Sequence, residues 1–277
     1  MSPEALKVVG VVIIFVVALL GGWLPALFRK STKAATFFSL GNAFAGGVFL
    51  GAGMLHMLPH AAETFNHMAD AHAGHHVHAT PWAFILASAG ILLILLIEKV
   101  IPTRRDFDET FMIDEVVGES CHKHAHGNHL HGATYPTILL AALSVHALFA
   151  GIAMGAESGV KEIAAILLAI LAHKLVESFA LGVTLAGSEY RRKTIIRLII
   201  IFALMTPIGV LLGASIMNMV DGHSRELAGA IFNSIAAGTF IYIATMDILN
   251  EEFHRPQMRW QKFTLVLVGF IAMSLIH

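Results

Sequence analysis

Long apolar stretches, separated by shorter polar segments, make up most of the chain. Eight of them approach or exceed the roughly 20 residues that a helix needs to cross a bilayer. The predicted spans are residues 7–28, 35–58, 81–101, 135–157, 162–187, 194–218, 226–249 and 260–277. The pattern predicts an all-α, polytopic membrane protein in which one transmembrane domain covers residues 1–277.

Lysine and arginine residues alternate between the predicted loops. The segments after the first, third, fifth and seventh spans hold 14 of the 18 basic residues, including those of a histidine-rich loop at 102–134. The opposite side holds Lys7, Lys161 and Arg225, and Lys174 lies within a span. Because basic residues gather in cytosolic loops, we expect that loop in the cytosol and both termini outside it or in an organelle lumen.

Composition supports a membrane location, gives no sign of nucleic-acid binding and shows an excess of histidine. Only 13% of the residues are charged, against about 25% in soluble domains, so the protein is expected in a plasma, inner or organelle membrane. The net charge of −1 does not indicate a nucleic-acid partner, and the single cysteine, Cys121, excludes an internal disulfide. The unusual feature is histidine, with 17 residues against 3 tryptophans.

Small residues recur at helical spacing in two of the predicted spans. Gly47 and Gly51 are four residues apart in 35–58, and Gly151 and Gly155 in 135–157. This spacing favours close helix packing; a sliding contact in a moving transporter is the alternative.

Three ionisable residues lie near the middle of the predicted span 162–187. His173 and Glu177 share one helix face because they are four residues apart, and Lys174 is adjacent to His173. Charged groups are costly in hydrocarbon, so these side chains must face the bundle interior or a wet cavity. A structural Lys174–Glu177 ion pair beside a core histidine is the alternative to a functional site.

His146 lies at a similar depth in the preceding span. The loop between the two spans is short, so the helices are expected to be antiparallel neighbours. Two imidazoles and one carboxylate, from His146, His173 and Glu177, would suit Zn²⁺ or a related divalent ion. Three protein ligands leave an open position, which a transport site needs because the ion must leave again.

Further acidic and imidazole groups flank this centre along the predicted ion path. His56, His60 and Glu63 follow one helix face at the outer end of the second span. Asp247 and Glu251 are four residues apart at the inner end of the seventh. We interpret the two clusters as groups that contact the ion as it enters and leaves the central site, one cluster on each side of the membrane. Polar helix ends at an interface are the alternative.

Two histidine-rich loops remain. One contains His67, His72, His75, His76 and His78, and the other contains Cys121, His122, His124, His126, His129 and His131. Such tracts bind metal ions loosely, so we favour weak capture or buffering of metal over an inert solvated linker.

These motifs, taken in order along nearly the whole chain, resemble the ZIP (Zrt/Irt-like) family of metal-ion transporters. The resemblance rests on 43–59 in the second span, His146, Phe149 and Gly151 in the fourth, His173 and Lys174 in the fifth, and 236–251 in the seventh. The His-Lys pair is typical of one branch of that family. A long histidine-rich loop between the third and fourth spans, such as 102–134 here, is also common in that family.

The resemblance implies a function and a site. It implies an eight-helix fold, a metal site between the fourth and fifth spans, often a homodimer, and movement of Zn²⁺ towards the cytosol, with Fe²⁺, Mn²⁺ and Cd²⁺ as alternatives. It also implies that Lys174 replaces a carboxylate that serves a second metal in other branches. Thr206 stands where some relatives have a further carboxylate. Both changes favour one bound metal.

One residue departs from the family pattern. The fourth-span motif has a glutamate where this chain has Ala150. The site would lose one carboxylate, so we expect weak affinity, altered ion preference or impaired transport. The sulfur of Met154, four residues further on, is a candidate replacement ligand.

Two other classes of protein compete with a transporter. The segment 72–76 mimics the His-x-x-His-His box of membrane di-iron enzymes, but the basic-residue count places it and the histidines of 122–131 on opposite faces. A metal sensor or regulator that has lost transport along with the glutamate is the second alternative.

Overall fold

A computed structural model describes residues 2–28, 32–73, 81–100, 134–217, 222–254 and 256–275. These ranges include only one residue of the predicted cytosolic loop 102–134, and they do not include His75, His76 or His78. The proposals of weak metal capture by the two histidine-rich loops therefore stay predictions.

All regular structure in the described part of the chain is helical. The α-helices are α1 (Pro3–Leu27), α2 (Thr32–Gly51), α3 (Leu58–Ala73), α4 (Trp82–Leu95), α6 (Thr134–Ala156), α7 (Val160–Gly187), α8 (Arg192–Met217), α9 (Gly222–Tyr242), α10 (Asn250–His254) and α11 (Arg259–Ser274). Three π-helical segments, η1 (Ala52–Met57), η2 (Leu96–Val100) and η3 (Ile243–Leu249), continue α2, α4 and α9.

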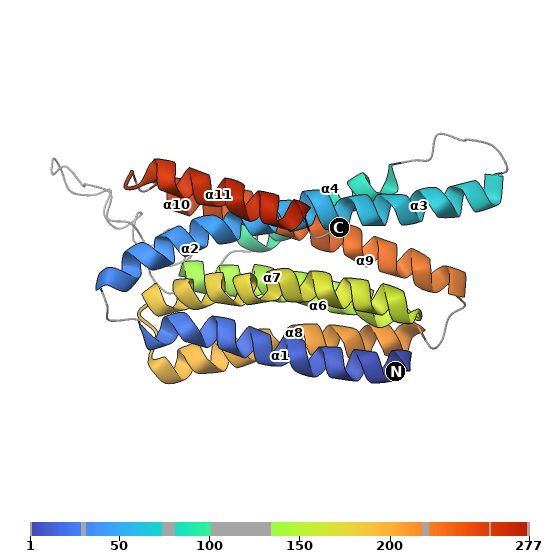
Figure 1. The fold of residues 1–277 in the computed structure, drawn as a ribbon, viewed down its shortest axis with the longest axis horizontal. Coiled ribbons are helices and arrows are strands. Elements are labelled where there is room, and N and C mark those ends of the chain that lie inside the picture. Colours follow the sequence, from blue (N-terminus) through green and yellow to red (C-terminus); the bar gives the residue numbers. More distant parts are fainter. Residues whose placement is uncertain are drawn as a thin grey trace, which may run out of the picture.

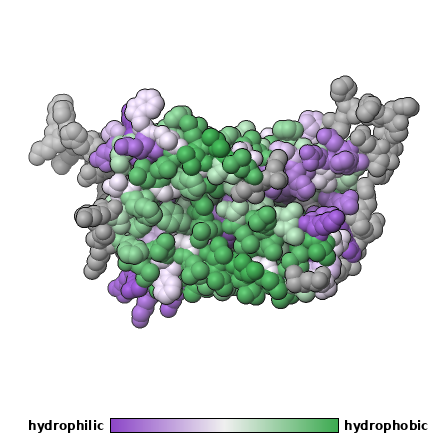
Figure 2. Space-filling model, viewed as in Figure 1, coloured by the Kyte–Doolittle hydropathy of each residue, from purple (hydrophilic) through white to green (hydrophobic). Residues whose placement is uncertain are grey.

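The helices have the length and surface of membrane spans. Seven continuous helices in the described residues are long and apolar enough to cross a bilayer. Large apolar side chains such as Val8, Val12 and Val16 of α1 are exposed on their outer faces. Figure 2 shows a broad apolar belt with hydrophilic residues towards both ends of the molecule. The protein is thus a polytopic all-α membrane protein, as the apolar pattern predicted.

The helices form two groups that lie side by side (Figure 1). In the first bundle, α1 packs on α7 and α8, and α6 packs on α8. In the second bundle, α2 packs on α11, and α4 packs on α9. The two bundles meet where α6 contacts α9 and where α7 contacts α2. The residues with candidate chemistry lie along this meeting surface.

Glycines hold α6 and α8 close together in the first bundle. A Cβ atom at Gly151 would collide with the carbonyl oxygen of Thr206, and one at Gly155 with that of Val210. The contact is reciprocal, because Gly209 and Gly213 of α8 press in the same way on the backbone of α6. The predicted close packing at Gly151 and Gly155 is therefore confirmed.

Glycines also join α2 to the last helix. Gly47 faces the carbonyl group of Val266, and Gly269 faces that of Phe44, again too closely for a Cβ atom. The predicted eighth span thus corresponds to α11, whose 16 residues extend for about 24 Å at 1.5 Å per residue. It is shorter than the seven other helices but is packed into the second bundle in the same manner.

Candidate metal site

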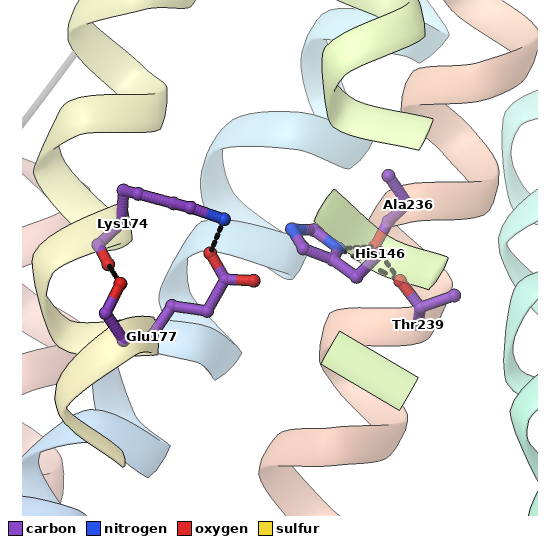
Figure 3. A network of polar contacts seen from close by, with 6 residues as sticks. His146, Lys174, Glu177, Ala236 and Thr239 are labelled. Atoms are coloured by element: carbon purple, nitrogen blue, oxygen red, sulfur yellow. Dashed lines mark hydrogen bonds and ion pairs between the residues drawn. The ribbon is translucent and has the colours of Figure 1, made fainter. Parts of the chain in front are cut away.

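His146 of α6 is fully buried and held in one orientation by α9. Its Nδ1 atom lies 3.0 Å from the carbonyl oxygen of Ala236 and 3.0 Å from Oγ1 of Thr239 (Figure 3). A carbonyl oxygen can only accept, so the proton is assigned to Nδ1. Its Nε2 atom then carries a lone pair, and this atom has no hydrogen-bond partner among the described residues. Such an orientation is typical of metal-binding histidines.

Phe240 of α9 contacts the rings of both buried histidines. The His146 ring stacks on Phe240 with centroids 3.5 Å apart, and His173 of α7 meets the same ring edge-on at 5.0 Å. The centroids of the two imidazoles are 6.1 Å apart. Phe240 is itself stacked on Phe49 of α2. The two predicted histidines, both from the first bundle, therefore do meet, at the surface where that bundle contacts Phe240 of the second.

The carboxylate of Glu177 is paired with Lys174 one turn away on α7. The ammonium nitrogen is 3.0 Å from Oε2 of Glu177, and each side chain is only 1% exposed. The same nitrogen lies 4.1 Å from the centroid of the Phe202 ring of α8, at cation–π distance. In Figure 3 both side chains extend from α7 towards the His146 ring.

Four buried atoms around this centre have no hydrogen-bond partner within the described part of the chain. They are Nε2 of His146, Nδ1 of His173, Oε1 of Glu177 and the ammonium nitrogen of Lys174, which has its ion pair with Glu177. The first three are nitrogen and oxygen atoms of the types that ligate a divalent cation. In this conformation, however, no three His, Cys, Asp or Glu side chains among the described residues gather closely enough to hold an ion. The groups are adjacent, but they are not closed around a common point.

The residues that depart from the family pattern are also buried in α6 and α8. Ala150 is 6% exposed and lies one turn from His146 on α6. Thr206 of α8 is 1% exposed. Met154 belongs to a separate apolar cluster with Leu6, Ile14, Ile163 and Leu167. Its terminal methyl group packs towards Gly10 of α1.

A cavity of about 550 Å³ opens between the bundles, at the end that holds the N-terminus. His60 lines it, whereas the predicted partners His56 and Glu63 are not among its lining residues. The other metal-binding groups on its wall are His67 of α3, Glu157 of the α6–α7 loop, Glu162 of α7 and Glu226 of α9. Sequence reasoning missed the three glutamates, which lie on separate elements and form no local pattern.

The cavity perturbs one of these carboxyl groups. Glu157 lies between the membrane-spanning helices α6 and α7. Burial raises the pKa of its carboxyl group, and Glu162 and Glu226 raise it further, while Lys7 acts in the opposite direction. Like charges drawn together in a partly dry place oppose ionisation.

At the other end, Asp247 of η3 is buried and has an acidic neighbour that sequence reasoning also missed. The side chain of Glu98 of η2 lies within hydrogen-bonding reach of both Asp247 and Tyr242. The contact crosses from one π-helical segment to another, and such segments are frequent at functional sites. An acidic residue in the last turn of an otherwise apolar span was the signal that could have revealed Glu98.

The fold and this centre define a class, namely polytopic α-helical membrane proteins with buried imidazole and carboxylate groups between two helical bundles. Comparisons with known proteins specify the family. The family described as "ZIP Zinc transporter" matches residues 4–133 and 114–277, so the chain belongs to the ZIP family.

Several relatives are named zinc transporters and are similar in length to this chain. Zinc transporter ZIP1 of Takifugu rubripes is 30% identical over 294 residues, covering 97% of this chain and 96% of the relative. Zinc transporter ZIP2 of Mus musculus is 30% identical over 305 residues, with the same coverage. Zinc transporter ZIP2 of Homo sapiens is 29% identical over 261 residues, covering 85% of this chain and 83% of the relative. Transporters are a non-enzymatic class, so these relatives favour transport over a di-iron enzyme.

Proposed function

We propose that this protein carries Zn²⁺, or a related divalent ion such as Fe²⁺, Mn²⁺ or Cd²⁺, across the membrane towards the cytosol. The ion binds between the two bundles through His146, His173 and Glu177. The observation that carries the proposal is that one nitrogen of each buried imidazole and one oxygen of Glu177 are among the four buried atoms at this centre without hydrogen-bond partners in the described residues. Buried polar atoms are normally satisfied, so such a group favours a ligand.

The ion pair at the centre suggests how the site fills. An arriving cation must compete with the Lys174 ammonium for the carboxylate of Glu177, which is 3.0 Å from it. Lys174 then supplies a fixed positive charge next to the metal and disfavours a second cation. The bond from Nδ1 of His146 to Ala236 keeps Nε2 ready to bind without reorientation.

The remaining predictions complete the proposed path. The ion passes His56, His60 and Glu63 on the outer side and Asp247 and Glu251 on the inner side. Both termini lie outside the cytosol or in a lumen, the protein belongs to the His-Lys branch, and two copies associate as a homodimer. These assignments rest on the loop charges, on residue order and on the family resemblance.

Metal uptake into reconstituted vesicles tests the proposal. Initial rates are measured for a panel of divalent ions with the parent, His173→Ala and Glu177→Ala. Loss of a direct ligand is expected to lower uptake by about tenfold or more, because even outer-shell changes cost 10–100-fold. Ser178→Ala is the matched control, since Ser178 is buried beside the site but donates to the carbonyl of Lys174.

Two outcomes would contradict the proposal. If His173→Ala and Glu177→Ala take up zinc as fast as the parent, the site lies elsewhere. If the parent binds zinc but a zinc-sensitive dye inside the vesicles does not respond, the protein is a sensor and not a transporter.

A further inference from the structure

The cavity between the bundles lies on the same helix faces as the proposed metal site. Its wall includes Ala153, seven residues after His146 on α6, and Ile166, seven residues before His173 on α7. Residues seven apart share a face and are separated by about 10 Å along the axis. Asn233, which also lines the cavity, is one turn before Ala236 on α9. The cavity therefore lies about two helical turns from the buried histidines, on the same faces of α6 and α7.

Negative charge dominates the wall of this cavity. Three carboxyl groups, those of Glu157, Glu162 and Glu226, face one ammonium group, that of Lys161. The nearby ammonium of Lys7, which donates to the carbonyl oxygen of Gly155 at 2.9 Å, offsets part of this negative charge. The imidazoles of His60 and His67 add lone pairs on the α3 side of the cavity.

The carboxylates come from both bundles. Glu157 follows α6 in the first bundle, yet its Oε1 atom lies 3.3 Å from where a Cβ atom of Gly229 would stand on α9. Glu226 is on that same helix. A cation between these groups would be attracted by both bundles at once.

The size of the cavity indicates the state of the ion. No three metal-binding side chains in the described ranges gather closely enough to strip and hold a bare ion. The volume of about 550 Å³ is ample for an ion with six waters, which occupy about 180 Å³ at roughly 30 Å³ each. Apolar walls such as Ile166, Met68 and Ala153 lower the local dielectric and strengthen the field of the carboxylates.

The geometry points to a cation-concentrating chamber, in which Glu157, Glu162 and Glu226 hold hydrated divalent cations before they reach the buried histidines. The chamber rests on the proposed transport function, for which it supplies the first binding step. It would act by raising the local ion concentration, so its loss should raise KM and leave the maximal rate unchanged.

Uptake kinetics test the chamber with substitutions that remove charge but keep shape. Zn²⁺ uptake is measured for the parent, Glu157→Gln, Glu226→Gln and the double variant. Each lost carboxylate is expected to raise KM about fivefold, the effect of a unit charge on a divalent ion about 8 Å away in a water-like dielectric. Added salt should raise the KM of the parent more than that of the double variant. Glu4→Gln, an exposed carboxylate in the first turn of α1 that does not line the cavity, should leave KM unchanged.

A second measurement does not require transport. Asn233→Cys, in a Cys121→Ser background, places one thiol on the cavity wall. A cationic methanethiosulfonate should modify it about tenfold faster than an anionic one, relative to a free thiol in solution, and this preference should fall in the Glu157→Gln/Glu226→Gln variant.

The two measurements separate the chamber from the transport function. An unchanged KM in the double variant, an equal rise in Glu4→Gln, or no reagent preference in the parent would overturn the chamber. If the parent shows no uptake but the charge preference is present and depends on Glu157 and Glu226, transport fails and the chamber stands.

Discussion

Two buried lysine–glutamate pairs have nearly the same length but different surroundings. Lys174 and Glu177 are 3.0 Å apart within α7, and Lys262 of α11 is 3.1 Å from Glu252 of α10. In the second pair every polar atom of the carboxylate is used, because Ser39 donates to Oε2 at 2.6 Å and Asn42 to Oε1 at 3.1 Å. Lys262 also donates to the carbonyl oxygen of Glu252 at 2.6 Å.

The first pair lacks this saturation. Oε1 of Glu177 has no hydrogen-bond partner among the described residues, and the additional contact of the Lys174 ammonium is the ring of Phe202. A saturated buried pair has no capacity to bind a further ion, so Lys262–Glu252 serves to join α2, α10 and α11. The unsaturated pair keeps a lone pair directed into the candidate site. The difference argues against reading Lys174–Glu177 as a purely structural ion pair.

The largest effect is expected from Lys262→Met. It leaves the buried Glu252 carboxylate without its cation, which typically costs about 3–5 kcal/mol of folding free energy. Thermal unfolding in detergent should show the loss, and zinc should raise the midpoints of this variant and of the parent equally, so that the deficit remains. Lys193→Met is the control, because Lys193 is exposed in the first turn of α8 and its loss should change stability by less than about 1 kcal/mol. Equal losses of stability in the two variants would show that the Lys262–Glu252 ion pair contributes no more to stability than an exposed lysine does.

Lys174→Met should destabilise the metal-free protein in the same way but respond differently to zinc. The freed Glu177 carboxylate can bind a cation, and an ion present at about 100 times its Kd stabilises by about 2.7 kcal/mol. The unfolding midpoint of Lys174→Met should therefore rise with zinc more than that of Lys262→Met. Parallel shifts in both variants would mean that Glu177 is as structural as Glu252.

Ala150→Glu should sharpen the contrast by adding a second carboxylate beside the unsaturated pair. A unit negative charge near a divalent ion is strongly attractive in a partly buried site, so we expect the KM for zinc uptake to fall by about tenfold. Ala150→Gln matches the size without the charge and should not improve uptake. If Ala150→Glu and the parent have the same KM, the placement of the site on α6 and α7 is wrong.

The amino-acid pattern predicted the parts of this protein that depend on local periodicity. Apolar length predicted the spans, and the four-residue spacing of Gly151 and Gly155 predicted a close helix contact that the structure has. The depth of His146 and His173 in neighbouring spans predicted that their side chains meet, and their rings are 6.1 Å apart. Whether they bind metal stays a prediction.

Features built from distant segments could not be predicted in this way. Phe240 and Ala236 orient His146 from a helix about 90 residues away in the chain, and no spacing rule connects them. The cavity likewise combines Glu157 and Glu226 from opposite bundles. Residues join such sites through tertiary packing, which a single sequence does not display.

The smallest expected effect concerns the pH dependence of uptake and Glu157. The raised pKa of its carboxyl group means that Glu157 takes up a proton at a higher pH than an ordinary glutamate. As the pH on the cavity side falls, Glu157 loses its negative charge before an ordinary glutamate does, the attraction for cations weakens and KM should rise by a few-fold. Above that range the carboxylate is ionised and its contribution is complete.

Glu157→Gln isolates this contribution because the amide is neutral at every pH. The variant should have a higher KM than the parent at neutral pH and a flatter pH profile. Other titratable groups around the cavity are present in both proteins, so their effects cancel in the comparison: Lys7, His60, His67, Lys161, Glu162, Arg225 and Glu226. Any pH dependence that survives in the variant arises from those other groups. Profiles of equal slope would show that Glu157 keeps its charge throughout the range and that the pH response arises from the histidines.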